Sequence, residues 1–424
     1  KVLAPLTNKI HCGHTSFGMS KNWNKFTRNR RIPSFPLYLK IWGDTMVVTG
    51  NLNRKDSLIK RGMLITSING IRNHNLVQKM FQYLPLDGYS DNVNYIRISS
   101  NFPFYHRNIF GLSKTYNVGY LDSNGLERTA SLPMYNPATD TAVKKQRIVQ
   151  VQKIPRHEIK KEQREDARIL EIDTLTQTAT LSMNTFVNGE GRHLRSFIKG
   201  SFKKIKEKNV KNLIIDLRSN GGGEVTMYVL LTRYIRKTKF RVSDSSYAIA
   251  STLAPYTAYI KHGFFNNLGL FFLTKKHADG NYHFGYWERH VYRPKTINHF
   301  DGKVYVLTNG PTFSASTLFC NAVKGQSNVT IAGEETGGGW HGNSGIMIPD
   351  IILPITKIKV RLPLFKLVQY NHMPKNGRGV SPDIFIPPTV DGVRQNIDRK
   401  MDIVKAMIRQ SNEQYGSYQN PNVK

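Results

Sequence analysis

The apolar and polar positions near the start of the chain fall into short stretches that predict strands. Two apolar stretches, 37–41 and 46–49, flank a Gly-Asp turn, and the alternating stretch 62–68 runs into an Asn-Gly turn signal. Apolar residues then repeat every four positions over 76–84, which is the spacing of one helical face. We expect these strands and this helix to form one small module of about 80 residues.

Different patterns follow in the second half of the chain. Residues 143–168 carry many charges and few large apolar side chains, which is typical of a solvated connection or a frayed helix. The stretch 179–186 alternates like a half-buried strand, and 194–205 places its apolar residues on one helical face. Continuous apolar runs, such as 213–217 and 304–308, are expected of strands that are covered on both faces. This succession of strands and helices predicts an α/β core with mainly parallel strands.

The composition is that of a globular protein and changes the picture mainly through its charge. With 424 residues, 39% of them apolar and 21% charged, the chain is neither disordered nor fibrous. Lys and Arg number 61 against 29 Asp and Glu, a formal net charge of +32. Such a surface attracts nucleic acid, anionic lipid, acidic polysaccharide or acidic peptide. The basic residues are dispersed rather than gathered in one known module, so no nucleic-acid partner is expected.

The chain has only two cysteines, which limits the disulfides and metal sites that it can form. Cys12 and Cys320 are too few for a disulfide-rich scaffold or a four-cysteine zinc module. The sequence still allows one disulfide between them. Cys12 and His14 stand two positions apart, which would allow a Cys–His nucleophile pair or a metal site. No further ligand spacing supports a metal, so neither a metal nor another cofactor is expected. No uncharged apolar run of about 18 residues predicts a transmembrane helix.

The first candidate for chemistry is a glycine-rich loop after the 213–217 strand. It reads DLRSNGGGE over residues 216–224 and runs into a predicted helix. Glycines here free backbone N–H groups to face an anion at the positive end of the helix dipole. The loop is therefore either an oxyanion hole or phosphate cradle, or a tight strand-to-helix turn. Its spacing fits neither the common phosphate loop nor the dinucleotide G-x-G-x-x-G motif.

The second candidate is the turn NGPTFSAST, residues 309–317, after the 304–308 strand. A serine at a strand-to-helix junction is often an N-cap that stabilises the helix by about 1 kcal/mol, which would suit Ser314 or Ser316. The same position also presents a nucleophile, because its oxygen is exposed and the next N–H group can bind a tetrahedral oxyanion. The lipase-type G-x-S-x-G motif is absent.

Four ordered motifs together resemble those of the C-terminal-processing (tail-specific) peptidase family. Leu213–Gly223 resembles the LIIDLRxNGGG strand and loop of the family, and Phe313–Ser316 resembles its SAS nucleophile turn. Gly333–Gly337 is similar to the family's GExTxG strand end, and Gly379–Ile384 to its GVxPDI segment. The order and spacing match over roughly residues 170–390.

The resemblance implies an α/β fold with a ClpP/crotonase-like core, an inserted PDZ-like domain and an N-terminal segment that completes the active site. We expect residues 1–33 to contribute to the catalytic domain and 34–115 to form the PDZ-like domain. Residues 116–400 would form the peptidase core, and 401–424 a C-terminal helix or tail. The family's usual carboxylate-binding loop is poorly matched near residue 35, so the PDZ-like domain would bind C-termini or simply position the substrate.

The resemblance also implies a catalytic serine and an oxyanion hole. Ser314 would be the nucleophile, and the N–H groups of Ala315 and of a glycine in the pair Gly222 and Gly223 would bind the oxyanion. Loss of one such donor typically costs about 3 kcal/mol of transition-state stabilisation. The glycine loop that ends at Trp340 would be either flexible or a rim of the cleft, with Trp340 lining it.

The base is implied by a further comparison of motifs. The bacterial branch uses a Lys just after the GExTxG motif, and that position is Gly339 here. The tricorn-like branch uses an N-terminal His in a GH[ST] motif, which implies that His14 is the base. The Ser and Glu that orient this His in the tricorn pattern are replaced by Gly13 and Asn376. Candidates for orienting His14 are therefore Thr15, Asn376 or a backbone carbonyl.

These features predict a serine endopeptidase that cleaves peptides or proteins, with acidic substrates favoured by the charge. The missing Lys, Ser and Glu motivate an alternative, a catalytically impaired peptide-binding protein on the same fold. The family mostly works outside the cytoplasm, so a periplasmic or surface-attached protein is expected, with peripheral or lipid-anchored attachment to the cell envelope. The chain begins with Lys1 rather than Met, so we expect either a mature form or an expressed part of a longer protein, in which any signal or lipid-attachment segment is already absent.

Overall fold

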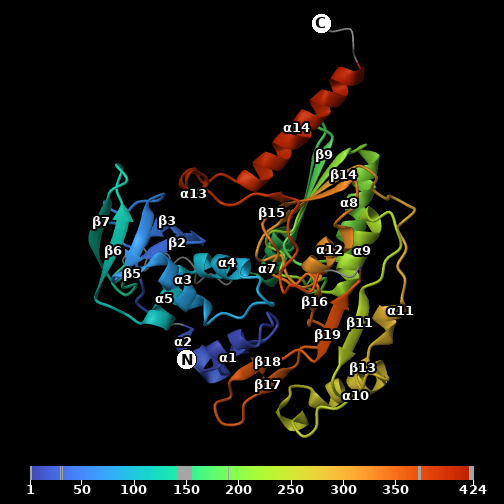
Figure 1. The fold of residues 1–424 in the computed structure, drawn as a ribbon, viewed down its shortest axis with the longest axis horizontal. Coiled ribbons are helices and arrows are strands. Elements are labelled where there is room, and N and C mark those ends of the chain that lie inside the picture. The colour runs from blue at the N-terminus through green and yellow to red at the C-terminus, as the bar shows by residue number, and fades with distance from the viewer. Residues whose placement is uncertain are drawn as a thin grey trace.

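The computed structural model describes residues 2–28, 30, 32–140, 155–189, 191–370 and 374–419. Within these residues the longer strands form four sheets. Figure 1 shows one of these sheets with its helices, drawn in blue and teal, beside a central sheet drawn in green and orange. The helix α14 (Arg399–Gln419) packs against the central sheet through its first turns, and its C-terminal end points away from both sheets.

The first sheet is antiparallel and belongs to a module with its own core. Its strands are β2 (Leu37–Trp42), β3 (Thr45–Asn51), β4 (Leu64–Ile68), β5 (Ile71–Arg72), β6 (Thr115–Leu121) and β7 (Glu127–Pro133). Its helices are α3 (Asn73–Phe81), α4 (Asn92–Ser100) and α5 (Phe102–Phe110). Apolar side chains of these helices, including Leu76, Ile98 and Phe102, pack with the strands in a cluster separate from the main core.

The strands predicted for this module are confirmed, but its expected end at residue 115 is wrong. Strands β6 and β7 lie beyond that position, and β6 pairs with β4 in the middle of the sheet. The module therefore includes residues up to Pro133, because buried side chains of both strands, such as Val118 and Leu132, belong to its apolar core. The predicted Asn-Gly turn is also confirmed, since Asn69 and Gly70 both adopt positive φ values, 50° and 77°.

The central sheet has the predicted α/β character. Its strand order is β20-β15-β14-β10-β9-β8, and every neighbouring pair is parallel except β8 with β9. The strands are β8 (Arg168–Asp173), β9 (Thr178–Met183), β10 (Asn212–Asp216), β14 (Lys303–Thr308), β15 (Val329–Gly333) and β20 (Ile384–Phe385). The helices associated with it are α7 (Arg156–Ala167), α8 (Leu194–Glu207), α9 (Val225–Ile235) and α12 (Ala315–Val323).

Both faces of the central sheet are covered, as its continuous apolar strands predict. Helices α8, α9 and α12 pack on one face and share the largest apolar core with Leu213, Ile215 and Val306. On the other face, Ile214 and Leu307 belong to a smaller apolar cluster with residues of α14. Part of the charged stretch 143–168 is the helix α7, and residues 143–154 lie outside the described residues.

Two further sheets are present, and one of them includes the N-terminal strand β1. One has the order β12-β13-β11-β19-β16, and the other has the order β1-β18-β17. Their strands are β1 (Ser16–Gly18), β11 (Ser243–Ala248), β12 (Lys275–Lys276), β13 (Tyr282–His283), β16 (Gly342–Asn343), β17 (Asp350–Ile352), β18 (Lys359–Arg361) and β19 (Phe365–Gln369). Because β1 pairs with β18, the segment that precedes β1 is held against the core.

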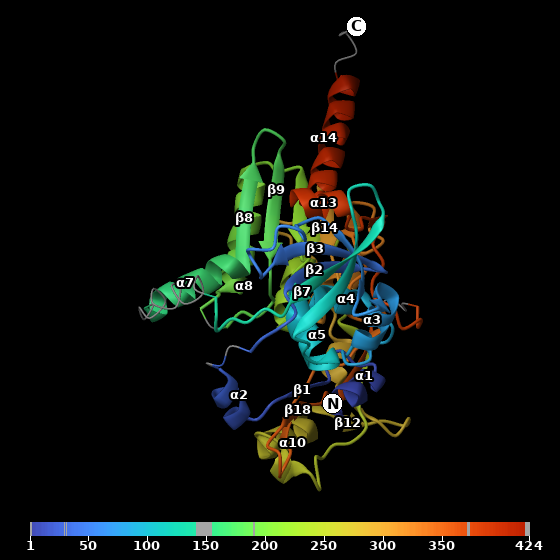
Figure 2. The same ribbon diagram turned by 90° about the vertical axis from the view of Figure 1, so that its left-hand side faces the viewer.

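The remaining helices complete the two ends of the molecule. They are α1 (Leu3–Lys9), α2 (Lys21–Thr27), η1 (Thr257–Tyr259), α10 (Gly263–Leu273), α11 (Gly285–Arg289) and α13 (Val390–Gln395). Figure 2 shows α14 and α10 at opposite ends of the molecule. Among the described helices, none is both long enough and apolar enough to cross a membrane.

Candidate active site

Ser314 lies where β14 ends and α12 begins, in an unusual backbone conformation. Its φ and ψ angles are 56° and −122°, a region that non-glycine residues rarely adopt. Its hydroxyl makes no capping hydrogen bond to the helix. The N-cap interpretation of Ser314 is therefore wrong, and the strained turn instead presents the hydroxyl away from α12. Such strain is concentrated at functional sites.

His14 reaches Ser314 from the other end of the chain. Its Nε2 atom lies 3.0 Å from Ser314 Oγ, a hydrogen bond that spans 300 positions of sequence. The imidazole packs on the Phe313 ring with centroids 4.7 Å apart. Gly345 also lies close to the ring, since a Cβ atom at this position would be 2.6 Å from His14 Nε2. The ring thus has two close neighbours besides Ser314.

The environment of His14 keeps the imidazole uncharged. Burial, followed by the positive charge of Arg361, lowers the pKa of His14 to about 4. Both causes disfavour the imidazolium form. At neutral pH the ring is therefore neutral, and one of its nitrogens can accept a proton.

The second ring nitrogen of His14 faces a serine that the motifs do not point to. Ser344 Oγ lies 3.4 Å from His14 Nδ1 and 3.0 Å from Cys12 Sγ. Thr15, one predicted orienting residue, is buried with its hydroxyl unpaired among the described residues. Asn376, the other, is exposed and accepts a hydrogen bond from Arg378 N at 3.0 Å, within its own turn. Neither is placed to orient the ring.

A buried carboxylate from the first module also enters this site. Asp87 is 7% exposed, and it accepts hydrogen bonds from Gly13 N at 2.5 Å and from Gly339 N at 3.4 Å. It therefore joins the backbone beside His14 to the glycine loop. Burial raises the pKa of Asp87 to about 6, although the two N–H groups and Arg97 partly oppose this effect. Sequence alone offered no signal for Asp87, since no motif includes it.

Cys12, His14 and Asp87 form a group with metal-ligand chemistry. A sulfur, a ring nitrogen and a carboxylate oxygen from these residues all lie within 4.8 Å of one another. These donor types suit zinc. Hydrogen bonds already engage all three side chains, and a metal on His14 would compete with the Ser314 contact. Both cysteines are free, so the disulfide left open by the sequence is not formed.

The glycine loop lies directly against Ser314, as the motif comparison implies. A Cβ atom on Gly222 would be 2.7 Å from Ser314 Cβ and 3.0 Å from Ala315 N. The Gly222 N–H donates to Asn220 Oδ1 at 2.9 Å, so this amide is already engaged. For the N–H groups of Gly223 and Ala315, the described part of the chain provides no acceptor. Of the three predicted oxyanion residues, these two are free to bind a ligand.

The second glycine loop closes over the Ser314 turn. Gly338 lies so close that a Cβ atom there would be 2.3 Å from Thr317 Oγ1 and 3.1 Å from Ser314 N. That Trp340 lines the cleft stays a prediction. Its ring packs against the main core with Lys324 Nζ 5.7 Å from the ring centroid, and its Nε1 is buried.

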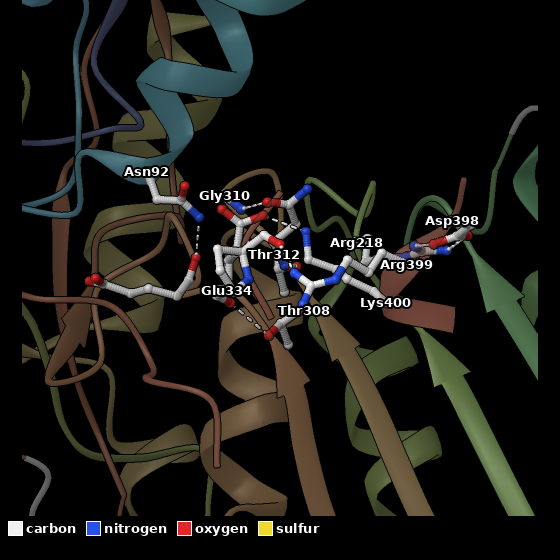
Figure 3. A network of polar contacts seen from close by, with 12 residues as sticks. Asn92, Arg218, Thr308, Gly310, Thr312, Glu334, Asp398, Arg399 and Lys400 are labelled. Atoms are coloured by element: carbon white, nitrogen blue, oxygen red, sulfur yellow. Dashed lines mark hydrogen bonds and ion pairs between the residues drawn. The ribbon is translucent and has the colours of Figure 1, made fainter. Parts of the chain in front are cut away.

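A polar network joins the strand ends that carry these loops (Figure 3). Thr308 Oγ1 donates to the Glu334 carbonyl at 2.8 Å, which links β14 to the segment after β15. Thr312 Oγ1 donates to the Leu217 carbonyl at 2.9 Å, which links the Ser314 turn to the glycine loop after β10. These bonds hold both loops in register at one edge of the sheet.

Ion pairs extend this network to the C-terminal helix. Arg218 contacts Asp216 at 2.6 Å and Asp398 at 2.5 Å, and Lys400 pairs with the buried Glu334. Figure 3 shows Arg218 beside Asp398 and Arg399, at the start of α14. Burial lowers the pKa of Arg218, but the hydrogen bonds and negative charges of these two carboxylates outweigh that effect and hold the pKa above its ordinary value. The conspicuous Arg of the glycine-rich motif thus anchors the strand end to α14.

The GEETG and GVSPDI motifs pack against each other next to the site. Glu335 accepts from Gly379 N at 2.6 Å and from Arg378 Nη2 at 2.7 Å, and it is also contacted by Ser90 Oγ at 3.3 Å. Asn92, visible on its helix in Figure 3, donates to the Glu335 carbonyl at 2.9 Å. The carboxylate therefore ties the first module to the loops around Ser314.

The region that contains the site matches a known peptidase family. The chain matches the sequence model of peptidase family S41 over residues 177–386, which is about half of its 424 residues. This region contains all four motifs and Ser314. A comparison with curated proteins gives no match.

Solved structures share the fold at low sequence identity. Mature CPAF complexed with lactacystin has a TM-score of 0.60 at 14% identity, covering 96% of this chain and 88% of that one. A second structure of mature CPAF has a TM-score of 0.60 at 14% identity, with 96% and 87% covered. The photosystem II D1 C-terminal processing protease is less similar, with a TM-score of 0.38 at 15% identity and with 93% of this chain and 84% of that one covered.

The family match and the Ser314 turn agree with the motifs read from the sequence. The chain belongs to peptidase family S41, the C-terminal processing peptidases, and is a serine-type peptidase.

Proposed function

We propose that the protein is a serine endopeptidase in which Ser314 is the nucleophile and His14 is the general base. The observation that carries this proposal is the 3.0 Å contact between His14 Nε2 and Ser314 Oγ. A nucleophile and its base within hydrogen-bonding distance are the signature of an activated serine. The neutral His14 has the protonation state that a base requires.

The chemistry at these atoms is an acyl transfer in two halves. Ser314 Oγ attacks the scissile carbonyl carbon while its proton passes to His14 Nε2. The tetrahedral intermediate collapses when His14 returns that proton to the leaving amine, and an acyl-enzyme ester remains on Ser314. A water molecule, deprotonated by His14, then attacks the ester carbonyl carbon. The bond to Ser314 Oγ breaks, His14 returns the proton to this oxygen, and the carboxylic acid product is released.

The oxyanion of the tetrahedral intermediate needs two donors near Ser314. The N–H groups of Gly223 and Ala315 suit this role because neither has another acceptor among the described residues. Gly222 would contribute by its lack of a side chain, which lets the loop approach Ser314. Donors that are fixed before the reaction stabilise developing charge without reorganisation.

Asp87 and Ser344 would replace the orienting residues found in the tricorn pattern. Ser344 Oγ faces His14 Nδ1, so it would accept a hydrogen bond from Nδ1–H, which keeps the proton on Nδ1 and leaves Nε2 as the proton acceptor. Asp87 is anionic above its pKa of about 6 and would stabilise the imidazolium that forms during attack. In this scheme Asp87 is a positioning residue that also supplies charge, and it belongs to the first module rather than to the catalytic core.

The larger architecture fits this proposal. The α/β part that contains the central sheet would be the crotonase-like core, and residues 34–133 would be the PDZ-like domain. Because Asp87, Ser90 and Asn92 reach the Ser314 site, this domain would complete the catalytic centre as well as position the substrate. A location outside the cytoplasm would suit a peptidase with this surface charge.

The catalytic assignment is tested by Ser314→Ala. Hydrolysis of peptide substrates should fall by several orders of magnitude, because the nucleophile is removed, while the melting temperature stays nearly unchanged. A fluorophosphonate probe should label the wild-type serine and fail to label the variant. Undiminished hydrolysis by Ser314→Ala would falsify the assignment.

Fluorophosphonate labelling also separates this proposal from the alternative of a peptide-binding protein. Peptide binding by the wild-type protein without labelling of Ser314 would favour the impaired form. The His14→Ala variant offers a second check, since it should retain peptide binding and lose labelling.

A further inference from the structure

Helix α10 carries an apolar stripe that faces away from the protein. Its four Phe side chains are 68%, 69%, 70% and 73% exposed at positions 264, 265, 271 and 272. Leu268, which lies between them, is 44% exposed, whereas Leu270 is 1% exposed. A contiguous group of exposed aromatic side chains marks an interaction site rather than ordinary surface.

The orientation of the stripe is fixed by the opposite face of the helix. At 100° per residue, the four Phe residues and Leu268 fall within an arc of about 120°, and Leu270 lies across from it. Leu270 packs with Leu253, Ile260 and Phe365 in a small apolar cluster. The helix is therefore anchored by one apolar face and presents a second one that no described residue covers.

A neighbouring hairpin adds to the same surface. Strands β17 and β18 are joined by a turn in which Ile355 is 92% exposed. The hairpin is held next to the start of α10 by a bridge between Ile351 and Ile260 and by a hydrogen bond from Lys261 N to the Asp350 carbonyl at 2.8 Å. Figures 1 and 2 place α10 and this hairpin at the end of the molecule away from α14.

The charges around the stripe are positive. No Asp or Glu occurs between residues 245 and 278, and Asp279, which follows this stretch, is paired with His283 at 3.1 Å. Lys261 precedes α10, and Lys275 and Lys276 follow it, all with exposed side chains. Lys357 is exposed beside Ile355 on the hairpin. The nearby Asp350 is already paired with Lys359 and Arg361, each at 3.4 Å, so it does not reverse this balance.

We propose that α10 and the hairpin tip dock the protein onto an anionic lipid surface. The Phe side chains would enter the boundary between headgroups and acyl chains, and the lysines would contact the anionic headgroups. With 11 residues, α10 is about 16 Å long, too short for a hydrocarbon core of about 30 Å, so it lies along the surface. The proposal does not depend on the catalytic role of Ser314.

A second copy of the chain fits this surface less well. Pairing two stripes would bring two sets of flanking lysines together, on chains that each carry a formal charge of +32. Like charges at the rim of an interface oppose association. An anionic membrane satisfies both the apolar stripe and the positive rim.

The test is vesicle co-sedimentation of the full chain, with phosphatidylcholine vesicles and with vesicles that also contain phosphatidylglycerol. The wild-type protein should bind the mixed vesicles at least about tenfold more strongly than phosphatidylcholine alone. The variant Phe264→Ser/Phe265→Ser/Phe271→Ser/Phe272→Ser should lose binding to the mixed vesicles by about tenfold or more. The variant Lys261→Gln/Lys275→Gln/Lys276→Gln should lose the preference for phosphatidylglycerol.

A matched control removes an exposed apolar side chain at the far end of the molecule. Leu175 is 95% exposed in the turn between β8 and β9, so Leu175→Ser should bind vesicles like the wild type. Melting temperatures and cleavage of a short soluble peptide should be unchanged in all variants, which shows that they fold. The proposal is overturned if the wild-type protein does not bind the mixed vesicles, or if the Phe variant binds them as strongly as the wild type does. A dimer that only the Phe variant dissociates, without vesicle binding, also overturns it and assigns the stripe to self-association.

Discussion

At Ser314 the backbone holds φ at 56°, which costs a non-glycine residue about 1–3 kcal/mol. This strain turns the hydroxyl toward His14 instead of toward the first amides of α12, where a serine in this position would usually bond. The N–H group of Ala315, one residue later, is left free for an oxyanion. The backbone conformation of this one residue therefore decides whether the serine caps the helix or presents its hydroxyl to His14.

The pH dependence of catalysis should report Asp87 rather than His14. With the pKa of His14 lowered to about 4 and that of Asp87 raised to about 6, His14 stays neutral while Asp87 gains its proton as the pH falls through 6. Loss of the Asp87 charge weakens stabilisation of the imidazolium, so kcat/KM should fall below pH 6. In Asp87→Asn, the kcat/KM measured at neutral pH should be about 10- to 100-fold lower than in the wild type. The pH below which kcat/KM falls should move from about 6 toward 4.

Stability distinguishes this role of Asp87 from a purely structural one. Folding raises the Asp87 pKa, so the folded state binds more protons between pH 4 and 6, and the contribution of this group to stability is lost as the pH rises through that range. Asp87→Asn should therefore be no less stable than the wild type at pH 7, while its activity falls. An acid limb that remains near pH 6 in the variant would contradict the assignment.

Gly222 tests how closely the glycine loop must approach Ser314. Its φ is 96°, and a Cβ atom would lie 2.7 Å from Ser314 Cβ and 2.8 Å from the Phe313 carbonyl. Gly222→Ala should lower the free energy of unfolding by about 1–3 kcal/mol and reduce kcat by about 100-fold or more, because the oxyanion donors shift. Gly221→Ala is the matched control, since a Cβ atom there meets nothing within 4 Å. Equal activity of the two variants would count against the loop's role.

At the level of elements, the site is built where several strand ends meet. The loops after β10, β14 and β15 all lie at the carboxyl edge of one parallel sheet, which is where α/β proteins place their ligands. His14 comes instead from a segment held between α1 and β1, and β1 is fixed by pairing with β18. Asp87 comes from the turn before α4. Three separate parts of the chain must therefore dock for the site to exist.

Glu335 provides a test of this docking. Its carboxylate receives Gly379 N–H at 2.6 Å and the Arg378 guanidinium at 2.7 Å, and its side chain is 16% exposed. Glu335→Gln should destabilise the protein by about 1–3 kcal/mol and lower activity, as measured by denaturant unfolding and peptide hydrolysis. Glu165→Gln breaks only an exposed helical pair with Lys161, so it should change neither. Equal losses of stability and activity in both variants would argue that Glu335 does not hold the first module against the loops around Ser314.

Across the whole molecule, the excess of basic residues sets which substrates arrive fastest. A chain with a formal net charge of +32 attracts acidic peptides over a distance set by the ionic strength. The same charge favours the anionic lipid surface proposed for α10, which lies at the end opposite α14. Substrate choice and location would then share one electrostatic origin.

Salt should therefore affect substrates according to their charge. We expect kcat/KM for an acidic peptide to fall several-fold as salt rises from about 0.01 to 0.15 M, chiefly through KM. A neutral peptide of the same length should be nearly insensitive. If both peptides respond alike, the charge does not guide the substrate.

Much of the fold could be predicted because its signals are local. Strands β9, β10 and β14 of the central sheet and the amphipathic helix α8 are encoded by hydrophobic patterns within a few consecutive residues. Strands β8 and β20 were not predicted. The module boundary at 115 failed because β6 pairs with β4, a non-local contact that no local pattern reveals. The motifs around Ser314 and Gly222 also predicted which loops would lie together.

The immediate surroundings of His14 depended on the tertiary structure. Ser344 and Asp87 are ordinary polar residues in sequence, and only folding brings them to within a few ångströms of a ring over 70 positions away from either. Thr15 and Asn376 make no hydrogen bond to the ring among the described residues, since proximity to a motif in sequence does not fix where a side chain points. Local patterns thus encode the strands, helices and loop types of this protein, whereas pairing between distant segments decides which groups meet, because each such contact is stabilised only when all its partners have folded.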